Sequence, residues 1–141
     1  MSSFDVEVVG EAAVPASEVR LLVASALGRA VSEGHAAVAF VSALRIAELN
    51  SQYRGKEGPT DVLSFPVDEA GEALGPRELG DIVICPEHTE DLREAIVHGA
   101  LHLVGYDHEV DDGEMLAVQA EVLAATRGRH SVPDRDERSP T

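Results

Sequence analysis

The pattern of apolar and polar residues predicts four short β-strands along the chain. They cover residues 4–9, 35–41, 62–67 and 81–85. Pro66 has no backbone N–H to donate, so the third segment is predicted to lie at the edge of a sheet or to end there. The last segment, DIVIC, is a continuous apolar run bounded by polar residues, which is typical of a central strand.

Apolar residues that recur at helical spacing predict four helices between and after these strands. They cover residues 17–33, 43–50, 89–104 and 114–126. Ser42 is predicted to cap the second helix, and Gly34 and Gly105 are predicted to end the first and the third. A polar loop at 53–60 separates the second helix from the third strand.

Two stretches show no apolar period. Residues 68–80 are rich in glycine and acidic residues and are predicted to form a mobile surface loop. Residues 128–141 contain too few apolar residues to fold and are predicted to be a disordered tail. The chain of 141 residues is therefore interpreted as a single domain at 1–127 followed by this tail.

The overall charge restricts which partners the chain can bind. It has 26 acidic and 11 basic side chains and a formal net charge of −15. Phosphate contacts need Lys and Arg, so this balance argues against binding polyanions unless basic residues cluster locally or a partner protein supplies the contact. No segment approaches the ~20 apolar residues of a membrane span, and no secretion signal is recognisable, which predicts a cytoplasmic protein without membrane contact. Cys85, the single cysteine, lies in the run DIVIC and is predicted to be a buried thiol.

The segment HGALHLVGYDH at 98–108 has the histidine spacing of a metal site. His98 and His102 are four residues apart, so a helix places both imidazoles on one face. Gly105 can adopt a left-handed conformation that reverses the chain and returns His108 to the same ion. Three imidazoles suit zinc best, although other divalent transition metals accept them, and three protein ligands leave one coordination position open for water, as in a catalytic site.

This spacing is that of zinc proteases, in which a glutamate follows the first histidine and acts as the general base. Here the corresponding residue is Gly99. A metal ion can still lower the pKa of water to about 7 without it. The substitution weakens the interpretation as a zinc peptidase, while other metallohydrolases remain possible. Asp81, Asp107 and Glu109 are candidates for orienting a ligand or accepting a proton, and none is preferred over a cap or a surface charge.

A second candidate group lies in the loop after the second helix. Arg54 and Lys56 are the closest pair of basic residues before the tail, and Tyr53 precedes them. A guanidinium group binds phosphate through two hydrogen bonds, and a tyrosine can stack on a base. Taken alone, the segment is better interpreted as an exposed loop with ordinary charges. His35, His88 and His130 have no comparable neighbours and are assigned no role.

Three motifs in this order closely resemble the YbeY family of bacterial single-strand-specific metallo-endoribonucleases. They are NSQYRGKEGPTDVLSFP at 50–66, GDIVICPE at 80–87 and HGALHLVGYDH at 98–108. The resemblance extends from about residue 43 to about residue 123, and the last motif is the most specific. It implies an α+β domain with a small mixed sheet of about four strands covered by helices.

The resemblance also implies a function and its residues. His98, His102 and His108 match the family's metal ligands for one zinc ion, and Arg54 matches a functionally required arginine, here interpreted as binding phosphate. The implied activity is cleavage of single-stranded RNA in the maturation of ribosomal RNA, at the 3′ end of the small-subunit rRNA, and in ribosome quality control. Ribosomal RNA and a ribosomal or ribosome-associated protein are the expected partners.

One departure from the family is expected to change the cleft. Only HTEDLREAIV separates the motif ICPE from HGALH, so a helix near the metal ligands should be shortened. Two alternatives to the nuclease remain open at this point. One is a zinc peptidase or other small-substrate metallohydrolase, and the other is a non-catalytic ribosome-associated protein stabilised by its metal.

Overall fold

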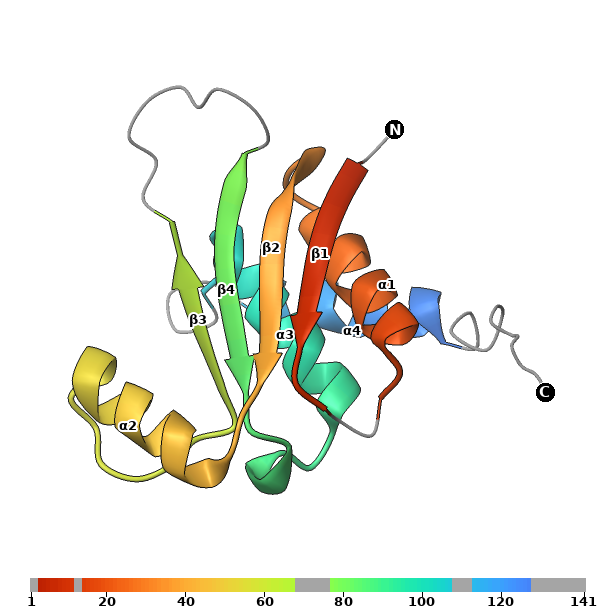
Figure 1. The fold of residues 1–141 in the computed structure, drawn as a ribbon. Helices are drawn as coiled ribbons and strands as arrows, with labels where there is room; N and C mark the ends of the chain where they lie inside the picture. The colour runs from red at the N-terminus through yellow and green to blue at the C-terminus, as the bar shows by residue number, and fades with distance from the viewer. Residues whose placement is uncertain (1–2, 12–13, 68–76, 108–112, 128–141) are drawn as a thin grey trace.

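The computed structural model describes residues 3–11, 14–67, 77–107 and 113–127. Its strands form one four-stranded sheet in the order β1-β2-β4-β3 (Figure 1). The parallel strands are β1 (Ser3–Val9), β2 (Glu33–Phe40) and β4 (Glu78–Ile84), and β3 (Val62–Pro66) pairs antiparallel with β4. The sheet is therefore mixed, as predicted for an α+β fold. The predicted central strand is β4, and the predicted edge strand, which contains Pro66, is β3.

Four α-helices cover this sheet. They are α1 (Ala16–Leu27), α2 (Ala43–Arg54), α3 (Leu92–Leu103) and α4 (Glu114–Thr126), and a short 3₁₀ helix, η1 (Pro86–His88), follows β4. Helices α1, α3 and α4 lie on one face of the sheet, and α2 lies against the β3 and β4 strands from the other side (Figure 1).

The alternation of side chains along the strands divides the core between the two faces. On β4, Ile82 and Ile84 point toward α1, α3 and α4, whereas Val83 points toward α2. Because β4 is covered on both sides, its sequence is a continuous apolar run and not an alternating one. Cys85 is completely buried on the side of the sheet that α2 covers, which confirms the predicted buried thiol.

Three helix ends differ from the predictions. Helix α3 begins at Leu92 and not at residue 89, because Asp91 caps it. Helix α1 ends at Leu27 and not near residue 33, and tight turns then carry the chain to β2. Gly28 costs helix stability of about 1 kcal/mol relative to alanine, and the chain must reverse there to reach the sheet. Helix α2 continues past the predicted end at residue 50 to Arg54, because Gly55 takes a left-handed conformation with φ of 70° and caps it.

The predicted mobile loop at 68–80 is partly strand, since β4 begins at Glu78. Residues 68–76 and the predicted tail at 128–141 lie outside the described residues. No helix in the described part of the chain is both long and apolar enough to cross a membrane.

One arginine of helix α3 contacts two other helices. Arg93 donates from Nε to Glu18 of α1 at 2.7 Å and from Nη2 to Thr126 of α4 at 3.2 Å. The Glu18 side chain is only 6% exposed. Its carboxylate therefore needs the Arg93 guanidinium group beside it to offset the free-energy cost of the lost solvation. These contacts restrict the movement of α3 relative to α1 and α4. They therefore also restrict the histidines that α3 carries.

Candidate active site

Helix α3 presents His98 and His102 side by side. Its N-terminus is capped by Asp91, which accepts from the Glu94 N–H, and its C-terminus is followed by Gly105 at φ of 104°. The two imidazole centroids are 4.7 Å apart, with the ring planes inclined by 77°. The two histidines are thus adjacent on one face of α3, and a glycine turn follows the helix, as predicted. His108 lies outside the described residues.

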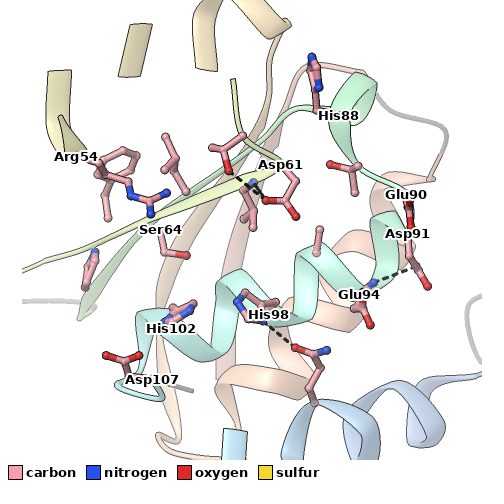
Figure 2. A pocket seen from close by; sticks show the side chains of 18 of the residues that line it. Arg54, Asp61, Ser64, His88, Glu90, Asp91, Glu94, His98, His102 and Asp107 are labelled. Atoms are coloured by element: carbon pink, nitrogen blue, oxygen red, sulfur yellow. Dashed lines mark hydrogen bonds between the residues drawn. The ribbon is translucent and has the colours of Figure 1, made fainter. Parts of the chain in front are cut away.

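His98 is held by a residue of the last helix. Its Nδ1 lies 2.9 Å from Oε1 of Gln119, which is itself buried on α4 (Figure 2). A carboxamide oxygen only accepts hydrogen bonds, so Nδ1 donates this one, and a metal ion would bind through Nε2. A histidine metal ligand has this arrangement, in which the second nitrogen is fixed by a hydrogen bond. The two described histidines therefore fit a divalent transition metal.

The histidines open onto a cleft of about 1150 Å³. All five residues of β3 line it, together with parts of α2, α3 and α4. Arg54 and Tyr53, at the end of α2, line the same cleft as His98 and His102. Arg54 is exposed and forms no hydrogen bond or ion pair with the described residues, so its guanidinium group is available for a ligand.

The charge along the cleft is polarised. Arg54 lies at one end, and the other end, near the start of α3, is acidic (Figure 2). The acidic residues that line that end are Asp61, Glu90, Asp91 and Glu94. An anionic ligand is therefore favoured at the Arg54 end and disfavoured at the other.

Gly99 faces the sheet and not the cleft. A Cβ atom built on it would lie 2.7 Å from Cγ2 of Ile82 and 3.1 Å from Cγ2 of Val62. No side chain fits at this position without moving the helix. The glutamate of zinc proteases, absent from the sequence here, is thus also excluded by the packing of α3 on β3 and β4.

The remaining candidates fall into three groups. Asp107 lines the cleft beyond the end of α3, near His102 (Figure 2). Asp81 and Lys56 do not line it. Glu109 lies outside the described residues. Of the three acidic candidates, Asp107 is therefore the one that the described structure places at the site.

Several residues of the site were not predicted from the sequence. Gln119 is one, because a glutamine in a helix gives no signal of its partner. Asn50 is another: its Nδ2 donates to Gly58 O at 2.9 Å and holds the loop that follows Arg54, while its buried Oδ1 has no partner among the described residues. The third is Ser64, whose hydroxyl donates to Gly99 O at 2.9 Å and joins β3 to α3.

A family model described as "Endoribonuclease YbeY" matches residues 12–127 of this chain. The chain belongs to the endoribonuclease YbeY family. The match covers most of the described elements and all of the site residues discussed above. At the level of the family, it confirms the predicted enzyme class, a hydrolase that cuts RNA internally.

Individual members of the YbeY family show the same relationship. Proteins named Endoribonuclease YbeY are similar to the chain in Rubrobacter xylanophilus (48% identity over 101 residues, 68% of this chain and 70% of the relative) and in Salinispora tropica (43% over 110 residues, 61% and 70%). The relative from Azorhizobium caulinodans is 39% identical over 139 residues, covering 84% of this chain and 87% of its own.

A solution structure of a Thermotoga maritima protein has the same fold. It is 30% identical in sequence, with a TM-score of 0.55 over 95% of this chain and 96% of the other. The mixed sheet and its helices are thus found in a solved structure as well. The segment expected to be shortened in this chain, residues 88–97, contains the last residue of η1, three linking residues and the first six residues of α3. Its length relative to the YbeY family stays a prediction.

Proposed function

We propose that this chain is a metal-dependent endoribonuclease that cuts single-stranded RNA. His98, His102 and His108 would hold one divalent ion, with zinc as the best match to three imidazoles. The observation that carries the proposal is the presence of two adjacent histidines and an arginine without a partner among the described residues in one cleft. A cation that binds phosphate beside a metal site is what phosphodiester cleavage requires.

Each residue of the proposed site has a separate role. Arg54 binds a phosphate oxygen of the strand and orients the phosphodiester next to the histidines. Gln119 holds the His98 ring in place through Nδ1, so that a metal ion would bind through Nε2. A bound divalent ion supplies Lewis-acid stabilisation of negative charge and lowers the pKa of water. Asp107, at the end of the cleft near His102, is our candidate for accepting a proton.

The cellular role is proposed from the family resemblance. We extend the proposal to the maturation of the 3′ end of small-subunit ribosomal RNA and to ribosome quality control in the cytoplasm. Ribosomal RNA is then the substrate, and a ribosomal or ribosome-associated protein is the partner. The charge of the cleft supports the proposal of a partner protein, because few of the residues that line the cleft attract phosphate.

The test is the effect of His102→Ala on bound zinc and on cleavage of a single-stranded oligoribonucleotide. Loss of one of three ligands should abolish stoichiometric zinc, measured by elemental analysis, and cleavage together. His35→Gln, which changes a histidine on β2 outside the cleft, is the control and should retain both. Cleavage by the metal-free protein, or by the His102→Ala variant, would contradict the proposal. Turnover of a peptide without cleavage of RNA would instead favour a peptidase.

A further inference from the structure

The main-chain groups of β3 alternate between its partner strand and the cleft. At one end of the strand pair, Cys85 N–H donates to Asp61 O at 2.9 Å, and at the other, Val67 N–H donates to Leu79 O at 3.2 Å. In an antiparallel pair, every second residue exchanges hydrogen bonds with the facing strand. The odd-numbered residues of this segment therefore bond to β4. The even-numbered residues direct their N–H and C=O groups outward, where no described strand pairs with them.

Ser64 is the outward-facing residue of β3 that has a free N–H. Pro66 has no N–H, and the N–H of Val62 donates to its neighbour Asp61 at 2.8 Å. The Ser64 N–H has no acceptor within the described part of the chain, and the residue is half-buried at the wall of the cleft. Its side chain is turned toward α3, because the hydroxyl donates to Gly99 O. This contact fixes the direction of the main-chain donor.

The position of this donor in the cleft favours an anion. Ser64 lies between the Arg54 side chain and the histidines of α3 (Figure 2). Arg54 is the nearby cation, and four of the five acidic residues that line the cleft lie toward the other end, the fifth being Asp107 near His102. A sheet edge offers a fixed dipole that needs no reorganisation when charge arrives. Two donors of different origin, a guanidinium group and a main-chain amide, therefore converge on one region.

We propose that the Ser64 N–H donates a hydrogen bond to a non-bridging phosphate oxygen of the bound RNA strand, beside the contact made by Arg54. This inference rests on the proposed function and adds a main-chain contact to the phosphate site. The free edge of β3 thereby becomes the wall along which the sugar-phosphate backbone lies. Single-stranded RNA reaches such an edge more easily than a duplex, because its backbone can follow the strand.

The test compares Ser64→Pro with Ser64→Ala in the zinc-loaded protein. Both variants lose the hydroxyl, and only Ser64→Pro also loses the N–H. Proline is compatible with this outward-facing position of an edge strand, as Pro66 shows. A lost hydrogen bond to a charged group corresponds to a fall in kcat/KM of about tenfold or more for Ser64→Pro relative to Ser64→Ala. Equal kcat/KM values in two folded variants would overturn the inference.

A second measurement uses the wild-type protein and does not depend on whether the proline variant folds. The zinc-loaded protein is labelled with nitrogen-15 and titrated with a single-stranded oligoribonucleotide. The Ser64 amide resonance should move further than those of Leu63 and Phe65, whose N–H groups bond to β4. Saturation with RNA without a change at Ser64 would overturn the inference.

The two proposals fail in different ways. If the wild-type protein cleaves RNA and the Ser64 amide resonance does not shift, the main-chain contact is overturned and the nuclease function stands. RNA that shifts the Ser64 amide without being cleaved supports the binding site and removes the catalytic proposal. An extended peptide that shifts this amide, where RNA does not, means that the edge of β3 accepts a peptide strand, which overturns the inference.

Discussion

Gly99 occupies a point at which α3 packs closely against β3 and β4. The nearest atom to a methyl group added at this position would be Cγ2 of Ile82, a completely buried and β-branched side chain with little freedom to move. The absence of a side chain at Gly99 thus sets the distance between the histidine helix and β3. That distance also sets the width of the cleft between the histidines and the Ser64 edge.

Gly99→Ala should therefore destabilise the protein despite the better helix propensity of alanine. Propensity favours alanine by about 1 kcal/mol, whereas overpacking a dense core costs roughly 1–3 kcal/mol. We expect a net loss in the free energy of unfolding, measured by urea denaturation, together with weaker zinc binding as α3 shifts. In an Ile82→Ala background the same substitution should cost less. An equal cost in both backgrounds would show that the contact with Ile82 is not the cause.

At the scale of single residues, sequence reasoning identified the side chains that bear distinctive chemistry. His98, His102 and Arg54 were predicted as site residues, and the structure places all three at one cleft. Their roles stay predictions. Gln119, Asn50 and Ser64 were missed, because each acts through a partner distant in sequence, such as the 35 residues between Ser64 and Gly99. The sequence does not specify such pairs until the fold brings them together.

Strands β2 and β4 are joined at one end by a pair of titratable side chains. His35 and Glu78 are register partners, and His35 Nδ1 lies 3.0 and 3.1 Å from the two carboxylate oxygens. The hydrogen bond to Glu78 raises the pKa of His35 above 6.5, against a smaller lowering by burial, and the charges of Glu78, Asp5 and Glu7 add to the increase. The protonated form is thus favoured in the folded state.

The sign of the resulting pH dependence follows from the raised pKa. The contribution of His35 to stability is fully present below the unfolded-state pKa of about 6.5 and is lost as pH rises through the higher folded-state pKa. The destabilisation caused by His35→Gln should be larger at about pH 5.5 than at about pH 8.5. Thermal melting of both proteins at the two pH values measures it. A pH-independent difference, or one unaffected in a Glu78→Gln background, would contradict the assignment.

Elements were predicted more accurately than their ends. The four strands and four α-helices were all expected, because their apolar periods are strong. The end of α1 was wrong, since Val31 falls at helical spacing but packs on the core from a turn. The end of α2 was also wrong, because a polar final turn leaves no apolar period to follow. In both cases the boundary depends on where the chain must turn to reach the sheet.

For the whole molecule, the net charge of −15 opposes binding of RNA. The structure reduces this conflict by placing Arg54 at one end of the cleft and four of the five acidic lining residues toward the other, with Asp107 near His102 as the exception. Arg54 is not neutralised by any described neighbour, so it retains its full charge for a ligand. Affinity for RNA should therefore depend on few cationic contacts and remain low without a partner.

Arg54→Ala should weaken RNA binding and reduce its dependence on salt. Each phosphate contact to a single strand contributes about 0.7 to the slope of log affinity against log salt, so the slope should fall by about that amount. Arg45→Ala is the matched control, since it removes the same charge from the same helix at an exposed position paired with Glu48. Fluorescence anisotropy over a salt series provides the measurement. Equal effects of the two substitutions would assign the loss to net charge and not to the cleft.

The hydrogen bond between His98 and Gln119 joins residues 21 positions apart, and the second of them lies on α4. During synthesis, α3 emerges from the ribosome before its orienting partner does. A nascent chain therefore carries His98 without this hydrogen-bond partner until α4 has been made and has packed. Ordering of the imidazole that would bind the metal is in this way coupled to the synthesis and packing of α4.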